Sequence, residues 1–290
     1  TLRGERWYVD QGVRLLSGRR VGEVDREAGE VVLEDGARVA YDRLVLATGS
    51  IPTLPPIRGL VGQDGRLHPK VHAFRSMADL DRLESAVPDA RRAVVVGGGL
   101  LGLQVARALA LRGVETEVVE GGTHLLRSQV GARAGGVLTR SLQRLGTAVY
   151  TGARAVRLTD DGLRLDNGYV LDTDLVVLTA GSRPATALAR RAGLFVRRGV
   201  VIDSRLTSVT DDRVSALGDC AEHHGRTTGF VSPAWEQARV LADVLAFYGV
   251  ELRRKRGDQE QGFERHWERS AIRVAPVTGV AGSIRPRSSP

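Results

Sequence analysis

Three glycines near the middle of the chain have the spacing with which proteins bind the pyrophosphate of a dinucleotide. Gly97, Gly99 and Gly102 follow a valine-rich segment in the pattern GxGxxG. The first glycine permits a tight turn, the second lets phosphate approach the backbone, and the third lets the next helix pack closely on its strand. The first N–H groups of that helix, near Leu100 and Leu101, would hold the phosphate oxygens. The alternative is a glycine-rich turn without a ligand.

Glu120 ends the next predicted strand, residues 114–120, and bears on which dinucleotide binds. A carboxylate at this place accepts hydrogen bonds from both hydroxyls of the adenosine ribose, but it repels a 2′-phosphate. Gly121 and Gly122 follow it, with no adjacent arginine to receive such a phosphate. The pattern therefore favours NADH over NADPH. A strand-end carboxylate without a ligand is the alternative.

One run of residues occurs twice. Residues 12–52 and 146–184 share two glycine turns, an apolar strand and a turn of small residues after that strand. Small residues let the backbone pass close to a bound cofactor. The two turns are Ala47, Thr48 and Gly49 in the first copy, and Thr179, Ala180 and Gly181 in the second. Only the second copy follows a GxGxxG pattern, so the first indicates a second nucleotide-binding domain that lacks its front half.

A last candidate site follows a short predicted strand at residues 214–217. Gly218 would allow a close approach, and Asp219 could accept hydrogen bonds from ligand hydroxyls. Asp219 is equally well explained as a helix cap or a turn residue. The predicted helix at residues 233–247 carries Trp235 near its start, and its N-terminal N–H groups could face an electron-rich ring.

The elements that would position these residues alternate between strands and helices. We expect an antiparallel meander and a buried parallel strand in the first copy, then a strand, a helix and a second strand around the glycines. The helix there would face inward through Leu103, Ala106, Ala110 and Leu111. The predicted strands are residues 13–16, 21–25, 31–34, 39–41, 44–47, 93–96, 114–120, 200–203 and 214–217. The predicted helices are residues 77–87, 100–112, 136–145, 185–192 and 233–247.

The composition excludes several classes of protein. The chain has 290 residues, 42% of them hydrophobic and 26% charged, which is ordinary for a globular protein. No apolar run reaches the roughly 20 residues of a membrane span, and no secretory signal opens the chain, so we expect a cytoplasmic protein. A single cysteine, Cys220, excludes an intramolecular disulfide and a redox-active dithiol. We expect no metal site, because Cys220, His223 and His224 lack a known zinc spacing.

The net charge of +8 does not by itself indicate a nucleic-acid partner. The arginines are scattered along the chain, apart from the basic run at residues 253–256, and a short run of charge is usually a solvated surface. We expect no binding to nucleic acid, although binding through the basic tail remains an alternative.

The turn at residues 47–49, the glycines with Glu120, and residues 217–219 together resemble the FAD-dependent pyridine nucleotide-disulfide oxidoreductase superfamily. The resemblance covers about residues 7–248. Residues 96–103 and 218–223 are most similar to the flavin module of assimilatory nitrite reductase large subunits, with ferredoxin and rubredoxin reductases close behind.

The resemblance implies a role for each site. Asp219 would bind the ribityl chain of FAD, and residues 47–49 would pass near the flavin. The helix that begins at Pro233 and carries Trp235, Glu236 and Gln237 would stabilise negative charge on the reduced ring. NADH would lie on the glycine turn and Glu120 and pass a hydride to FAD. Electrons would then reach a protein or domain acceptor, an iron–sulfur or sirohaem protein. No general acid or base is needed, so no catalytic residue is expected.

The expected fold is α/β, with two Rossmann-like, three-layer dinucleotide-binding domains, of which the FAD domain is discontinuous and incomplete. Residues 1–58 and 183–248 would form the FAD domain, residues 59–91 a crossover, residues 92–182 the NAD domain, and residues 249–290 a disordered or atypical tail.

Three features depart from the family pattern. The FAD-side GxGxxG is absent, Gln104 stands where many relatives carry glutamate, and the sirohaem and iron–sulfur cysteines are missing. The last departure means that this chain cannot reduce nitrite itself. An NADH-binding fragment or sensor, without FAD and without catalysis, is therefore the alternative function.

Overall fold

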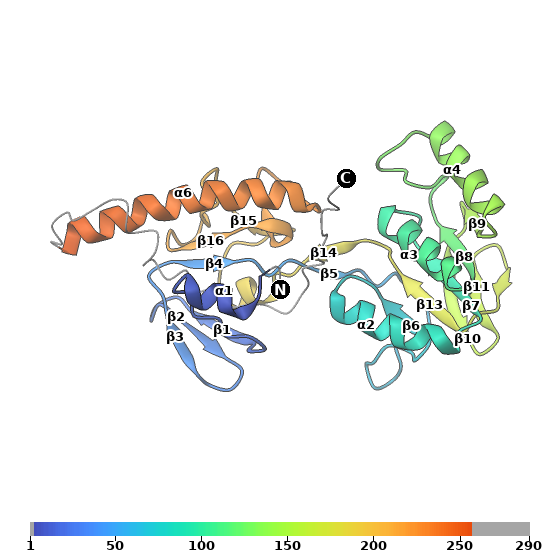
Figure 1. The fold of residues 1–290 in the computed structure, drawn as a ribbon, viewed down its shortest axis with the longest axis horizontal. Coiled ribbons are helices and arrows are strands. Elements are labelled where there is room, and N and C mark those ends of the chain that lie inside the picture. Colours follow the sequence, from blue (N-terminus) through green and yellow to red (C-terminus); the bar gives the residue numbers. More distant parts are fainter. Residues whose placement is uncertain (1–2, 257–290) are drawn as a thin grey trace, which may run out of the picture. The chain divides into compact units, whose positions relative to one another are not determined.

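The computed structural model describes residues 3–256, and the chain divides into two compact units. Unit 1 consists of Thr1–Ser50 and Arg183–Pro290, and unit 2 consists of Ile51–Ser182. Each unit has helices and strands of its own (Figure 1). Each also has its own buried hydrophobic clusters. The short strands β5 (Ser50–Pro52) and β14 (Ser182–Pro184) lie where the chain passes from one unit to the other.

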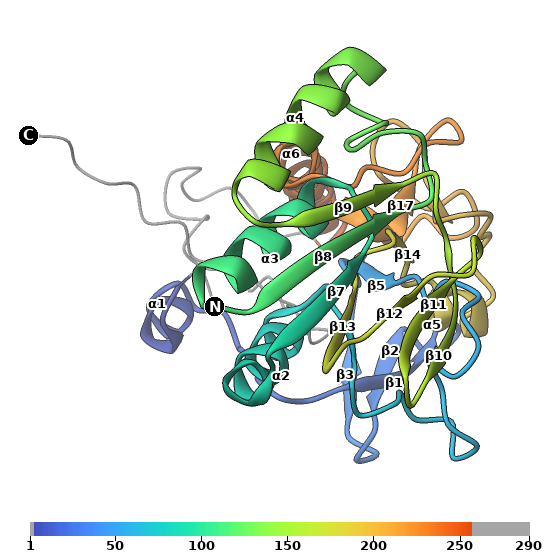
Figure 2. The same ribbon diagram turned by 90° about the vertical axis from the view of Figure 1, so that its right-hand side faces the viewer.

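Unit 2 is built on a parallel sheet of five strands. Their order is β6 (Val71–Ala73), β13 (Leu175–Leu178), β7 (Arg92–Val96), β8 (Glu115–Glu120) and β9 (Ala148–Thr151). One face carries α2 (Met77–Ala86), the 3-10 helix η1 (Val87–Asp89), α3 (Leu100–Leu111) and α4 (Ala132–Arg144). The other face carries an antiparallel meander of β10 (Ala155–Thr159), β11 (Gly162–Leu165) and β12 (Val170–Leu171) (Figure 2). Unit 2 therefore has three layers.

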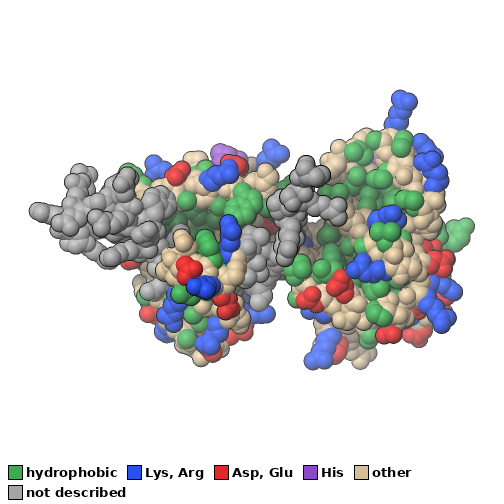
Figure 3. All heavy atoms as spheres, in the orientation of Figure 1, with side chains coloured by type: hydrophobic (Ala, Val, Ile, Leu, Met, Phe, Trp, Pro, Cys, Tyr) green, Lys and Arg blue, Asp and Glu red, His purple; other side chains and the backbone are tan. Residues whose placement is uncertain are grey.

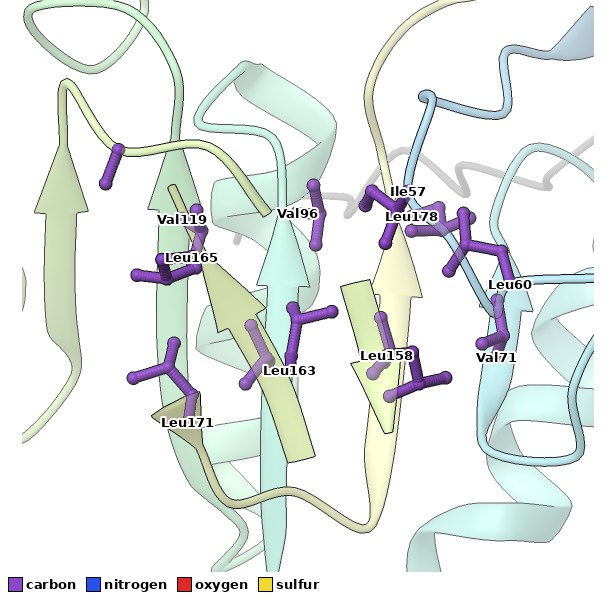
Figure 4. Close-up of a cluster of buried hydrophobic side chains, with 13 residues drawn as sticks. Ile57, Leu60, Val71, Val96, Val119, Leu158, Leu163, Leu165, Leu171 and Leu178 are labelled. Atoms are coloured by element: carbon purple, nitrogen blue, oxygen red, sulfur yellow. The ribbon is translucent and has the colours of Figure 1, made fainter. Parts of the chain in front are cut away.

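Strand β13 is apolar at every position, and β7 is apolar after Arg92, because both faces of the sheet are covered there. In β7, Val94 and Val96 belong to the cluster under the meander, whereas Ala93 and Val95 belong to the cluster under the helices. Figure 4 shows the cluster under the meander, in which Leu158, Leu163 and Leu165 pack with side chains of the sheet such as Val96. The uninterrupted apolar runs of the sequence thus form a sheet buried on both sides.

Unit 1 combines a second meander with short parallel pairs. The meander consists of β1 (Val21–Asp25), β2 (Glu30–Leu33) and β3 (Arg38–Ala40). Its parallel pairs are β4 (Leu44–Leu46) with β16 (Val214–Ala216), and β15 (Val200–Val201) with β17 (Ala221–Glu222). The helices are α1 (Glu5–Asp10), α5 (Ala187–Arg191), η2 (Gly218–Cys220) and α6 (Val231–Arg256).

The two meanders share the same register. In β1 and β2, Val21 pairs with Leu33 and a bulge precedes the next pair, Glu23 with Val32. In β10 and β11, Ala155 pairs with Leu165, and the corresponding bulge precedes the pair of Arg157 with Arg164. Each meander leads into a parallel strand, β4 or β13. The repeat seen in the sequence is therefore a repeat of structure.

The structure confirms the α/β class and most of the predicted elements. The strand predicted at residues 13–16 is wrong: this segment is irregular, and Gly12 and Gly18 on either side of it take positive φ angles of 65° and 71°. Helix α1 was not predicted because it has no buried residue and hence no apolar face. Leu111 was wrongly expected to face inward; it is 68% exposed, since the helical period brings Leu109 to the buried face instead.

Two helix boundaries differ from the prediction. Helix α4 begins at Ala132 rather than at residue 136, so Gly135 lies inside the helix. Packing explains this glycine, since a Cβ on Gly135 would lie 2.7 Å from the ring of His124. Helix α6 was expected to end at residue 247, but it continues through Gly249 to Arg256. The remainder of the tail, residues 257–290, lies outside the described residues.

Candidate functional site

The glycine turn of unit 2 connects β7 to α3, and two of its glycines are required by the packing of the chain itself. A Cβ on Gly102 would lie 1.9 Å from the carbonyl oxygen of Gly97. Gly97 has a φ of 120°, and a Cβ there would lie 2.6 Å from the carbonyl oxygen of Thr179. These two glycines let α3 and β13 approach the turn closely.

Gly99 is different, because no other part of residues 3–256 occupies the place of its missing side chain. It caps the N-terminus of α3 with an extended backbone, φ −79° and ψ 177°, and no atom lies within 4 Å of an added Cβ. The first N–H groups of a helix have no partner within that helix. The turn therefore leaves open space beside Gly99, at the start of α3, where Leu100 is 51% exposed.

Glu120 is fixed beside this turn. One oxygen of its carboxylate accepts a hydrogen bond from the N–H of Gly98 at 2.7 Å, and the other accepts one from the N–H of Gly122 at 2.6 Å. The Nε of Arg127 lies 3.8 Å from the same carboxylate. No arginine is adjacent to Glu120 in the sequence, but a loop brings Arg127, seven positions further along the chain, beside its carboxylate.

The turn at residues 179–181 lies against the glycine turn because β13 pairs in parallel with β7. The Oγ1 of Thr179 donates to the carbonyl oxygens of Val96 at 3.1 Å and Gly97 at 3.2 Å. Gly181 takes a φ of 91° with open space around it. The structure thus brings Gly181, the glycine turn and Glu120 into one part of unit 2.

The candidate residues of unit 1 meet at the carboxyl ends of two parallel strands. Since β4 pairs with β16, residues 47–49 and 217–219 follow these strands at the same end. The Oγ1 of Thr48 donates to the carbonyl oxygen of Ala185 at 2.7 Å. Gly49 and Gly218 have φ angles of 67° and 71°, and Ala47 is exposed.

Two hydrogen bonds from outside the turn hold this second site together. The Oγ of Ser50 donates to the carboxylate of Asp219 at 2.8 Å. The N–H of Gly218 donates to the Oε1 of Gln237 at 2.7 Å. Trp235 lies on the same helix, α6, and is 54% exposed. No motif marks Ser50, which only the pairing of β4 with β16 identifies; Gln237 lies on the helix that the family resemblance assigns to the flavin, but its bond to Gly218 was not predicted.

Gln104 lies on α3 in unit 2, where it lines an apolar groove of about 230 Å³ together with Leu80 of α2 and Leu101. In unit 2 taken alone, this groove is lined mainly by aliphatic side chains, together with Phe74, Glu84 and Arg112.

Cys220 is a structural thiol. It is fully buried, burial raises its pKa, and its Sγ lies 3.3 Å from the carbonyl oxygen of Leu46. Within residues 3–256, no three His, Cys, Asp or Glu side chains are grouped so that they could hold a metal ion. In the same part of the chain, no helix has the length and apolar character needed to cross a bilayer. On the faces shown in Figure 3, basic side chains are interspersed with acidic ones.

A parallel sheet with a GxGxxG turn between a strand and a helix, and a carboxylate that ends the next strand, defines a Rossmann-type dinucleotide-binding unit. The family model for pyridine nucleotide-disulphide oxidoreductases matches residues 7–239, and the chain belongs to this family. Its members are FAD-dependent NAD(P)H oxidoreductases.

Three relatives illustrate the match. The NADH nitrite reductase large subunit of Escherichia coli K12 is 35% identical over 87% of this chain and 30% of its own length. A ferredoxin reductase from Rhodopseudomonas palustris has a TM-score of 0.76 at 29% identity, over 84% of this chain and 61% of that structure. An FAD-dependent oxidoreductase of the same family from Desulfovibrio vulgaris has a TM-score of 0.66 at 31% identity, over 78% and 61%. The chain therefore spans less than two thirds of each of these relatives.

Proposed function

We propose that this chain is the nucleotide-binding module of a flavoprotein that moves electrons from NADH to a redox partner. Unit 2 binds NADH, and unit 1 contributes to the binding of FAD. A hydride, which carries two electrons, leaves NADH for the flavin and yields NAD⁺. The electrons then pass to an iron–sulfur or sirohaem protein or domain. The cytoplasm is the proposed location.

The observation that carries the NADH half is the contrast among the glycines of one turn. Gly97 and Gly102 are explained by the packing of the chain, whereas Gly99 has open space around it. The packing of the chain does not require a glycine at position 99. A ligand phosphate that contacts the backbone would require one. Glu120, held by the N–H groups of Gly98 and Gly122, is ready to accept hydrogen bonds from ribose hydroxyls without reorganising.

In unit 1, the hydrogen bond from Ser50 holds the carboxylate of Asp219 at the carboxyl ends of β4 and β16. Under the proposal, this carboxylate binds the hydroxyls of the FAD ribityl chain, and residues 47–49 pass near the flavin. The N-terminal part of α6, which carries Trp235, provides a positive dipole end toward a reduced, negatively charged ring. The protein thereby supplies position and electrostatics, and the cofactors supply the chemistry.

The NADH half is tested with two matched glycine variants. Gly131 caps α4 as Gly99 caps α3, with φ −74° and ψ 165°, and an added Cβ there also meets nothing within 4 Å. We expect Gly99→Val to weaken NADH binding at least about tenfold in calorimetric titration, because the valine fills the place of the pyrophosphate. Gly131→Val should bind NADH like the parent chain. Equal affinities for the two variants, or no binding of NADH by the parent chain, would refute the assignment.

The alternative function is an NADH-binding or sensor module without FAD. It is favoured by one observation: in the described part of unit 1, β4 pairs in parallel with β16 alone, and no GxGxxG turn accompanies the pair. Titration of the chain with FAD, followed by flavin absorbance and fluorescence, separates the two functions. Tight binding of FAD excludes the sensor. Binding of NADH without FAD supports the sensor and refutes the flavoprotein.

A further inference from the structure

One peptide group of the glycine turn is hydrogen-bonded at both of its polar ends. This peptide joins Gly97 to Gly98. Its carbonyl oxygen accepts a hydrogen bond from the Oγ1 of Thr179 at 3.2 Å, and its N–H donates to the carboxylate of Glu120 at 2.7 Å. Thr179 follows β13 and Glu120 ends β8, the two strands that flank β7 in the sheet. The orientation of this peptide therefore depends on a side chain from each side of the turn.

The backbone by itself fixes this peptide weakly. Glycines stand on both sides of it, and glycine takes positive and negative φ angles about equally well. Gly97 has a φ of 120°, which other residues rarely adopt. If the peptide rotated, the N–H of Gly98 would turn away from Glu120, and the carboxylate would lose one of the two N–H groups that bind it. A side chain that holds the carbonyl end therefore also keeps Glu120 in place.

Thr179 contacts the turn through more than this one bond. Its N–H donates to the carbonyl oxygen of Val96 at 2.9 Å, and its Oγ1 donates to the same oxygen at 3.1 Å. A Cβ added at Gly102 would lie 2.6 Å from this Oγ1. The hydroxyl of Thr179 thus lies where the end of β13, the glycine turn and α3 meet.

The internal repeat shows that this hydroxyl accompanies the glycine turn. The strand end of the first copy, residues 44–49, reads LVLATG, and that of the second copy, residues 176–181, reads VVLTAG. When the final glycines are aligned, Ala47 stands at the place of Thr179. The threonine of the first copy is Thr48, which donates instead to the carbonyl oxygen of Ala185. The copy with a threonine at this place is the copy that lies beside the GxGxxG turn.

We propose that Thr179 is a positioning residue of the dinucleotide site, whose hydroxyl fixes the peptide between Gly97 and Gly98 and, through that peptide, Glu120. The inference rests on the proposed function, in which the glycine turn and Glu120 hold the adenosine half of NADH. With the hydroxyl present, the turn and the carboxylate have their binding arrangement before NADH arrives. Without it, NADH must order the turn as it binds, and the affinity falls.

The test compares three variants of Thr179 by calorimetric titration of the full chain with NADH. Thr179→Val keeps the size and branching of the side chain but lacks the hydroxyl, and we expect it to bind NADH about five- to tenfold more weakly. Thr179→Ala introduces the residue of the first copy and should lose a similar factor, which excludes added bulk as the cause. Thr179→Ser keeps the donor and should bind within about twofold of the parent chain. ADP-ribose, which lacks the nicotinamide, should lose the same factors as NADH.

The matched control is Thr173→Val, just before the start of the same strand. Thr173 is fully buried, and its Oγ1 donates to the carbonyl oxygen of Leu175 at 2.8 Å. Removing this hydroxyl should lower the midpoint of urea unfolding at least as much as Thr179→Val does. The affinity for NADH should nevertheless stay within about twofold of the parent chain, because Thr173 does not contact the turn.

The outcomes separate this inference from the proposed function. If Thr173→Val and Thr179→Val both lose NADH affinity in proportion to their lost stability, the role of Thr179 is structural only and the inference is overturned. Unchanged NADH affinity in Thr179→Val also overturns it, and leaves the proposed function standing. If the parent chain binds neither NADH nor ADP-ribose, the proposed function fails and the inference fails with it.

Discussion

The two meanders of this chain are alike in register, yet the parallel strands that they lead into have different surroundings. Strand β13 lies between β6 and β7 in a five-stranded sheet, whereas β4 pairs with β16 alone in the described residues. The bulge and the cross-strand pairs recur in both copies. Local sequence is therefore enough to define the meander, while the size of the parallel sheet depends on segments elsewhere in the chain.

The two candidate sites are also held in different ways. In unit 2 the glycine turn is fixed by close backbone contacts, such as that of Gly102 with Gly97. In unit 1 the turn at Gly218 and Asp219 is fixed by side chains, Gln237 and Ser50. Added atoms should therefore disrupt the site in unit 2, and removal of polar groups should disrupt the site in unit 1.

The largest effect should follow from one added methyl group in unit 2. We expect Gly102→Ala to lower the free energy of unfolding by about 3 kcal/mol or more, because its Cβ would overlap the carbonyl oxygen of Gly97. Hydrogen exchange in β7, β8 and β13 should accelerate. Gly99→Ala is the control: its Cβ meets nothing, and the expected cost is under about 1 kcal/mol. Equal exchange rates in the two variants would contradict the packing role of Gly102.

An intermediate effect should follow from neutralising a buried carboxylate in unit 1. Glu222 is 1% exposed, pairs with Arg197 at 2.8 Å and accepts hydrogen bonds from the N–H groups of Arg198 and Gly199. Burial alone would raise the pKa of Glu222, but these N–H groups and the charge of Arg197 together hold that pKa below its ordinary value. We expect Glu222→Gln to cost about 1–3 kcal/mol at pH 7.

The same variant gives a pH dependence with a definite sign. Because the folded pKa is lowered, the ionised carboxylate stabilises the fold fully above its ordinary pKa, near about 4.3, and this stabilisation is lost as the pH falls through the folded value. The difference between the parent chain and Glu222→Gln should therefore be largest at pH 7 and shrink below about pH 4. Tryptophan fluorescence is the measurement, since Trp7 and Trp235 belong to unit 1. A difference that grows toward low pH would contradict the lowered pKa.

The smallest effect concerns the polar contacts of the second site. We expect Ser50→Ala to weaken FAD binding by about three- to tenfold, because Asp219 loses the hydroxyl that orients it. Ser85→Ala on α2 removes a hydroxyl whose bond to the carbonyl oxygen of Asp81 lies in unit 2, and it should leave FAD affinity unchanged. Flavin fluorescence during titration measures both. If both variants bind FAD as the parent chain does, the Ser50 contact has no part in the site.

The sequence predicts this fold best where a residue's role depends on near neighbours. A strand, a turn and a helix can be predicted from short segments without knowledge of the remaining chain. The spacing of Gly97, Gly99 and Gly102 and the apolar runs of β7 and β13 are sufficient. Periodicity failed at Leu111, where several leucines and alanines allow more than one apolar face.

Contacts between partners that are distant in sequence escaped prediction. Ser50 lies 169 positions from Asp219, Gln237 lies 19 positions from Gly218, and Arg127 reaches Glu120 through a loop. Their types are common at surfaces, so only the tertiary structure distinguishes them from solvated side chains.

The burial of Cys220 makes the chain convenient for chemical labelling. Its one thiol is enclosed, and burial raises the thiol's pKa, so the reactive thiolate is scarce at neutral pH. A cysteine introduced at Gly99 would therefore be the one thiol open to a maleimide dye in the native chain. The rate of its modification would report directly whether a nucleotide covers the turn.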